Sequence, residues 1–225
     1  MGIILKQGIQ NTIITYVGII IGFISTIVIQ PLFLTPSEIG LTRILFSFSA
    51  LIAIFMPLGI TNITTKYFPV YRNKDERHHG YFGFMLIFPL MGFIITTSLL
   101  YIFRDLIIAQ YAKESKLFTE FFYYIYPLSF FLCLNSILNL YCFSIFKSSF
   151  PSFINDIIIR IFSIILFSVY FLKCINIDEL IFLFVTIYGL QFMILLIYIL
   201  IIDRPGLSIN IVFFKSKPIK KMISY

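Results

Sequence analysis

The sequence is poor in charge and has no tryptophan. Of its 225 residues, only 12% are Asp, Glu, Lys or Arg, and 60% are hydrophobic. A soluble domain carries roughly 25% charged residues, so the composition excludes an ordinary soluble, disordered or fibrous protein. The three cysteines show no CxxC spacing, and no nucleotide-binding, metalloprotease or hydrolase motif is present. The sequence therefore predicts a polytopic membrane protein that is not an enzyme and needs no metal or cofactor.

Long uncharged runs predict where the chain crosses the membrane. Five runs of 22 to 31 residues contain no charged side chain, and each exceeds the roughly 18 apolar residues that mark a spanning helix. A sixth apolar segment contains only Asp156 and Arg160. Helices are expected because hydrocarbon cannot satisfy an open sheet edge and the runs lack the alternation of barrel strands. The prediction is an all-α bundle of six transmembrane helices over residues 1–203, with spans at about 11–34, 39–65, 81–103, 120–146, 153–172 and 179–202, followed by a basic cytoplasmic tail at 204–225.

Basic residues predict the orientation of the bundle. With the N-terminus in the cytoplasm, eleven Lys and Arg residues fall in cytoplasmic segments and four in external loops, as the positive-inside rule requires. We therefore predict that both termini are cytoplasmic. Topology then accounts for the net charge of +7, and no binding to nucleic acid is expected. His78 and His79 fall in a cytoplasmic loop, where we expect them to be solvated rather than to bind a metal.

Three charged side chains fall within predicted spans, where they are costly. Arg43 either reaches the interface beside Glu38 or stands at the mouth of a central cavity. Asp156 and Arg160 are four residues apart, so they share a helix face and are candidates for a structural ion pair. Alternatively, Arg160 faces the cavity and meets an anionic substrate, because a guanidinium group stays charged and binds phosphate through two parallel hydrogen bonds.

Uncharged polar and small residues within the spans predict close helix contacts. Asn135 and Asn139 are also four residues apart, and such amides either join helices or contact a substrate. Gly18 and Gly22 form a GxxxG pattern, which allows two helices to approach closely. Pro57, followed by Leu-Gly, predicts a bend in the second span.

Several short strings together resemble one protein family. Residues 34–41 read Leu-Thr-Pro-Ser-Glu-Ile-Gly-Leu, residues 57–62 read Pro-Leu-Gly-Ile-Thr-Asn, and residues 141–150 read Tyr-Cys-Phe-Ser-Ile-Phe-Lys-Ser-Ser-Phe, with Asp156 and Arg160 downstream. In this order the strings resemble the N-terminal region of polysaccharide flippases (O-antigen type) in the multidrug/oligosaccharidyl-lipid/polysaccharide exporter superfamily. In that family a Pro-Glu-x-Gly external turn joins the first two helices, and the third string corresponds to the connection between the fourth and fifth.

The resemblance implies two six-helix lobes around a cavity, and rocking of the lobes would carry a lipid-linked oligosaccharide from the inner to the outer leaflet of the bacterial cytoplasmic membrane. The lipid would be undecaprenyl diphosphate, so Arg43 and Arg160 become candidates to bind the substrate, together with Asn135 and Asn139. Family members have about twice as many spans as this chain, and residues 214–225 resemble the lead-in to a seventh helix. We therefore expect a truncated or split half that works with a second lobe or subunit, surrounded by membrane lipids.

Two other functions are compatible with the sequence. A cation-coupled exporter of drugs or small solutes in the same superfamily would need an acidic residue deep in the cavity. Apart from acids at the first residue of a span, the only acid within a predicted span is Asp156, which makes this function less favoured. The other is a membrane subunit of a polysaccharide-export complex that does not itself transport, for which six helices suffice.

Overall fold

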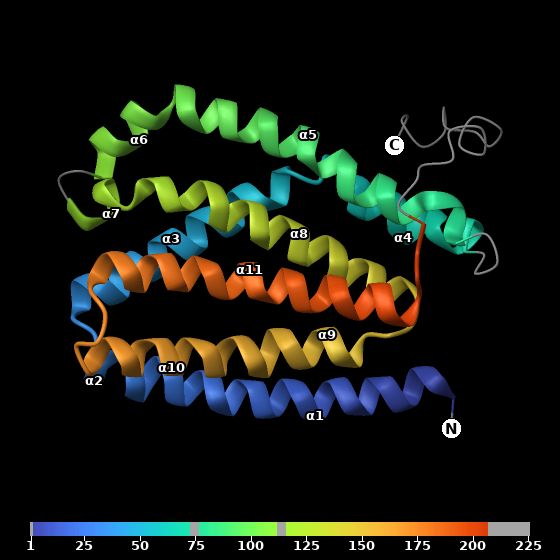
Figure 1. Cartoon of the computed structure of the whole chain (residues 1–225), viewed down its shortest axis with the longest axis horizontal. Coiled ribbons are helices and arrows are strands. Elements are labelled where there is room, and N and C mark those ends of the chain that lie inside the picture. The colour runs from blue at the N-terminus through green and yellow to red at the C-terminus, as the bar shows by residue number, and fades with distance from the viewer. Residues whose placement is uncertain (1, 73–76, 112–115, 207–225) are drawn as a thin grey trace.

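The computed structural model describes residues 2–72, 77–111 and 116–206. Within these ranges it is all helical, and the long helices run roughly side by side (Figure 1). Six segments are long and apolar enough to cross a membrane: Leu5–Phe33, Pro36–Phe55, Arg77–Ile102, Phe122–Ser144, Ser149–Phe171 and Ile177–Ile202. The predicted polytopic bundle of six helices is thereby confirmed. Of the predicted basic tail, residues 207–225 lie outside the described residues.

Most spans combine several helical elements. The first consists of α1 (Ile3–Phe23), the π-helical η1 (Ile24–Ile29) and α2 (Gln30–Phe33); the second is α3 (Pro36–Phe55), followed by α4 (Ile60–Tyr71). The third consists of η2 (Arg77–Gly80) and α5 (Tyr81–Ile102), followed by α6 (Arg104–Tyr111) and α7 (Lys116–Glu120). The fourth consists of η3 (Phe122–Tyr124) and α8 (Ile125–Ser144). The fifth consists of α9 (Ser149–Phe153), the π-helical η4 (Ile154–Ile158) and α10 (Ile159–Phe171), and the sixth is α11 (Ile177–Ile202).

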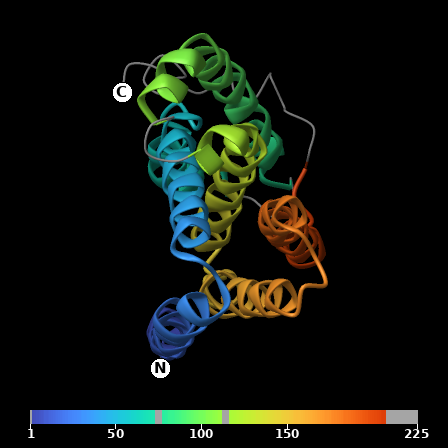
Figure 2. The same ribbon diagram turned by 90° about the vertical axis from the view of Figure 1, so that its left-hand side faces the viewer.

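Helix α8 is the centre of the bundle. Ten of its 20 residues are buried, and it packs against α3, α4, α5 and α11. The first span lies at the edge and packs mainly on α9, η4 and α10. Figure 2 shows α1 and α10 side by side, with α3 and α8 above them and α11 to one side. Many large apolar side chains remain exposed on the outer helices, as expected for a surface that faces hydrocarbon.

The turn between the first two spans is tighter than the resemblance implies. Helix α3 begins at Pro36, and Thr35 caps it. The Glu38 carboxylate accepts a hydrogen bond from the Thr35 backbone N–H at 2.8 Å, which completes a capping box. Proline suits this position because its missing N–H would have no helical partner there. The Pro-Ser-Glu-Ile-Gly string therefore forms the first turn of α3 rather than a loop between helices.

The second predicted span, 39–65, is interrupted near its middle. Helix α3 ends at Phe55, and the chain turns through Leu58 (φ 47°) and Gly59 (φ 82°) before α4 begins. Glycine adopts this left-handed conformation without a steric penalty. The bend predicted at Pro57 is confirmed, but the helix that crosses the membrane ends earlier than predicted because α4 takes a new direction.

Helix α5 lies very close to the break in the second span. A Cβ atom at Gly92 would collide with the backbone carbonyl of Met56, so we expect Gly92→Ala to lower the free energy of unfolding by about 1–3 kcal/mol. Gly40→Ala is the matched control, because a Cβ at this helical position meets nothing within 4 Å. Circular dichroism during denaturant titration in mixed micelles measures both variants. Equal stability of the two variants would contradict this packing.

Candidate functional site

A cavity of about 710 Å³ lies between the helices. Side chains from the first, second, fourth, fifth and sixth spans line it. The predicted substrate-binding candidates Arg43, Asn135, Asn139 and Arg160 all lie on its wall, although they come from three different helices. Its polar lining residues are Ser25, Thr26, Gln30, Thr42, Arg43, Ser47, Asn135, Ser136, Asn139, Asn155, Arg160, Ser163, Tyr188 and Gln191.

The charge of the cavity is positive. Arg43 and Arg160 both line it, and among the described lining residues none is Asp or Glu. The low-dielectric helices around the cavity strengthen the field of these two cations relative to the same charges in water. The cavity is therefore suited to an anionic group and unsuited to a cation.

Arg43 has an exposed guanidinium group, and no described residue pairs with it. Its expected neighbour Glu38 is occupied elsewhere. Besides capping α3, the Glu38 carboxylate accepts a hydrogen bond from the Tyr170 hydroxyl at 2.5 Å. Glu38 therefore does not bind Arg43, and the Arg43 side chain lines the cavity.

Asp156 and Arg160 do not form the expected ion pair. Each instead has a partner on α1: Thr15 donates a hydrogen bond to Asp156 at 3.1 Å, and Arg160 donates one to the Gly18 carbonyl. The two side chains do share a helix face, as predicted. The ion pair is absent from the described residues because α1 passes so close that its hydroxyl and carbonyl groups satisfy both side chains.

The close approach of α1 is explained by its two glycines. A Cβ at Gly18 would lie 2.8 Å from the Asp156 backbone oxygen, and one at Gly22 would overlap the Arg160 guanidinium group. The predicted close-packing role of the GxxxG pattern is confirmed. The guanidinium group of Arg160 lies against Gly22 of α1, and the same side chain also lines the cavity.

Amide side chains form a hydrogen-bonded chain across three helices. Asn135 on α8 donates to the Gln191 side chain at 3.2 Å and to the Tyr188 carbonyl at 3.0 Å, and Gln191 donates to Asn155. Asn135 thus joins helices, one of the two roles left open for it. The Asn135 and Asn139 side-chain oxygens are buried and have no hydrogen-bond partner among the described residues. Both residues line the cavity.

A second buried polar cluster was not expected from the sequence. His78 is fully buried, and its Nε2 lies 2.9 Å from Oδ2 of Asp203. Tyr141 donates a hydrogen bond to the same oxygen at 2.5 Å. The expectation that His78 is solvated is therefore wrong, because the end of α11 covers it. The only signal in the sequence was that His78 and Asp203 flank predicted spans whose ends lie on the same side of the membrane.

Comparisons of the chain with protein-family models, with curated proteins and with solved structures found no match. Its six helices that are long and apolar enough to cross a membrane indicate a multi-pass membrane protein.

Proposed function

We propose that this chain is one lobe of a flippase that moves an undecaprenyl-diphosphate-linked oligosaccharide across the bacterial cytoplasmic membrane for surface polysaccharide synthesis. A second lobe or subunit would complete the transport pathway. One observation carries the proposal. A cavity between the apolar helices is lined by two arginines, and among the described lining residues none is acidic.

A diphosphate is the group that this cavity is best suited to bind. Guanidinium groups match phosphate oxygens through paired, charge-assisted hydrogen bonds. An unpaired arginine within a membrane span is costly, and a permanent anion offsets that cost without a change in protonation. Arg43 supplies this interaction from α3, and Arg160 supplies it from α10.

The remaining chemistry of the cavity suits sugars. Serine, threonine and amide side chains of the lining both donate and accept hydrogen bonds, as sugar hydroxyls do. The volume falls within the 300–1,000 Å³ range typical of small-molecule sites, so it holds the diphosphate and the nearest sugars, and a longer glycan extends beyond it. The apolar outer surface leaves the isoprenoid tail in the surrounding lipid.

The cationic lining disfavours a cation-coupled exporter. Such a protein needs a carboxylate in the cavity to bind the coupling ion or a cationic drug. Asp156, the only acid considered for this role, bonds to Thr15 and does not line the cavity. Two guanidinium groups would also repel a cationic ligand.

A polar ligand requires the cavity to be open to water. Ser136 is exposed on the cavity wall, whereas Met193 is exposed on the outer surface of α11. In a background without Cys133, Cys142 and Cys174, we expect Ser136→Cys to react with a charged thiol reagent at least about tenfold faster than Met193→Cys, because thiolates form in water and not in lipid. Mass spectrometry of timed samples measures the rates. Equal rates would mean that the cavity is not hydrated.

Loss of Arg43 tests the proposed activity. In the source bacterium with its own gene deleted, we expect the wild-type gene to restore surface polysaccharide. Arg43→Ala should reduce it at least about tenfold at an unchanged protein level, because one charge-assisted contact is worth about 1.5–3 kcal/mol. Arg43 is preferred to Arg160 for this test because Arg160 also bonds to α1. Immunoblots of polysaccharide and protein provide the measurement.

The matched control is Lys116→Ala, which removes an exposed cation at the start of α7, outside the cavity. It should restore polysaccharide as well as the wild type does. Normal polysaccharide in the deletion strain would disprove the proposed activity. Full restoration by Arg43→Ala would disprove the role of this arginine.

A further inference from the structure

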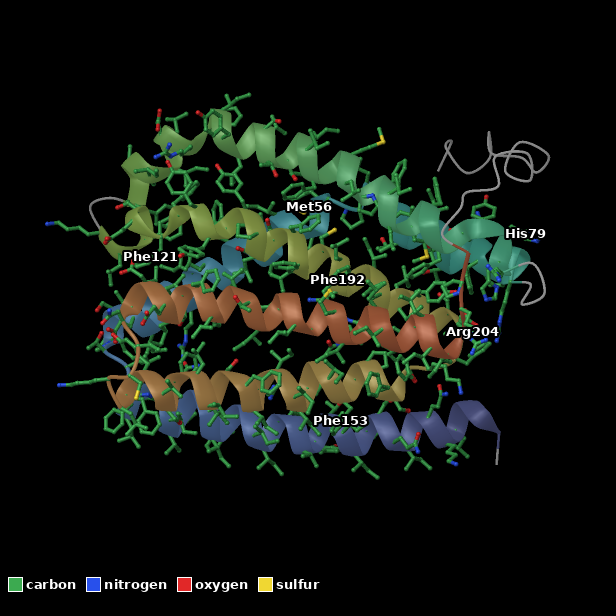
Figure 3. All side chains as sticks on the ribbon, in the orientation of Figure 1. Met56, His79, Phe121, Phe153, Phe192 and Arg204 are labelled. Atoms are coloured by element: carbon green, nitrogen blue, oxygen red, sulfur yellow. The ribbon has the colours of Figure 1, made fainter. Side chains whose placement is uncertain are left out.

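A separate pocket of about 410 Å³ lies between the last turns of α5 and the start of α8. It is at the end of the bundle where α6 and α7 lie (Figure 1), and Figure 3 shows Phe121 at this end and His79 and Arg204 at the other. None of its lining residues lines the cavity that contains Arg43. Four side chains with hydroxyl groups and one apolar side chain line it: Thr97, Ser98, Tyr101, Tyr126 and Ile102.

The pocket is on the outer surface of the bundle, at the end of a span. Ser98, Tyr101 and Ile102 are exposed, and the third apolar segment ends at Ile102. Tyrosine at the end of a span is typical of the boundary between hydrocarbon and lipid headgroups. A polar pocket in this place is therefore accessible from the lipid layer at the depth of the headgroups.

Arg104, the first residue of α6, supplies a positive charge beside the pocket. Its guanidinium carbon lies 4.7 Å from the centre of the Tyr123 ring, a distance at which the ring attracts the cation. The Tyr123 and Tyr126 rings are 6.5 Å apart. Arg104 is also close enough to Tyr126 for a direct electrostatic interaction. Because Tyr126 lines the pocket, the field of this cation extends into it.

The charge of Arg104 has no anionic partner among the described residues. No described carboxylate lies within ion-pair distance of it. Asp105 follows it on α6 and is exposed, and adjacent residues of a helix do not face each other. The Nε atom of Arg104 is buried without a hydrogen-bond partner in the described part of the chain, as are the hydroxyl oxygens of Thr97 and Tyr126. Because a half-buried cation without a partner is costly in a membrane, this place favours an anion.

We propose that this pocket binds the phosphate group of an anionic phospholipid. The guanidinium group of Arg104 attracts the phosphate, and the exposed hydroxyls of Ser98 and Tyr101 donate hydrogen bonds to its oxygens. The exposed apolar surface of α5 at Ile95 and Leu99 accommodates an acyl chain. A lipid with a net negative charge fits better than a zwitterionic one, whose own ammonium group already neutralises its phosphate. The site does not depend on what the larger cavity transports.

The absence of tryptophan from the chain allows a fluorescence test. Leu99 is exposed on α5 and lies outside the pocket lining, so Leu99→Trp places a single tryptophan beside an intact pocket. The purified full-length variant is reconstituted with brominated phosphatidylglycerol or brominated phosphatidylcholine, because bromine on an acyl chain quenches tryptophan on contact. The extent of quenching gives the relative affinity of the two lipids. We expect phosphatidylglycerol to bind about fivefold more tightly, the gain that one basic residue near a membrane surface provides.

Variants made in the Leu99→Trp chain test the role of the cation. Arg104→Gln should remove the preference for phosphatidylglycerol, whereas Arg104→Lys should keep most of it because the charge remains. The matched control is Lys116→Ala, which removes an exposed cation at the start of α7, outside the pocket, and should leave the preference unchanged. Equal affinities for the two lipids before Arg104 is changed, or a preference that survives Arg104→Gln, would overturn the proposal.

Two further measurements separate a lipid from a free phosphate compound and guard against a variant that does not fold. Soluble glycerol phosphate carries the same phosphate without acyl chains and should leave the quenching unchanged. Loss of the lipid preference in its presence would assign the pocket to a free phosphate compound and overturn the proposal. If Arg104→Gln does not fold, salt decides in the Leu99→Trp chain. The preference should fall as NaCl rises from about 0.1 M to about 1 M, and a preference that does not change would show that charge is not its cause.

Discussion

The cost of a polar group in hydrocarbon is the constraint on which the rest of this structure depends. It requires helices, because only they satisfy the backbone within each segment. It also directs the few polar side chains of the spans toward one another or toward a cavity. Asn135, Gln191 and Asn155 meet this requirement as a hydrogen-bonded chain. A guanidinium group cannot lose its charge. Arg160 therefore donates a hydrogen bond to a backbone carbonyl, and Arg43 lines the cavity.

Glycine determines how the first span takes part in this arrangement. A helix normally shields its carbonyls with side chains, but at Gly18 and Gly22 that shield is absent and the fifth span approaches α1 directly. The Gly18 carbonyl then serves as a partner for Arg160. One pair of small residues therefore provides both the helix contact and the space for a charged side chain. A larger residue at position 22 would occupy the place of the guanidinium group and force it to move.

The sequence predicted the features that hydrocarbon enforces locally. The spacing between charged residues located all six spans. Because arginine and amide side chains are energetically costly within a membrane span, the sequence also identified Arg43, Asn135, Asn139 and Arg160, which share one cavity. The helix end at Phe55 was missed because residues 56–65 contain no charged side chain to mark the end of the span. The partners of Asp156 and the burial of His78 were missed because they depend on α1 and on α11, which are distant in sequence. Such contacts follow from tertiary packing, and no local pattern encodes them.

Hydrogen bonds between the helices hold the backbones that carry the two arginines. Glu38 joins α3 to α10 through Tyr170 at one end, and the amide chain joins α8, α11 and η4 toward the other. Two like charges around one cavity repel each other, and these bonds resist that repulsion without neutralising it. An anion that enters meets donors already in position, so little ordering is needed and the repulsion is relieved on binding. The same arrangement that makes the empty cavity less stable therefore favours a doubly charged ligand over a neutral one of the same size.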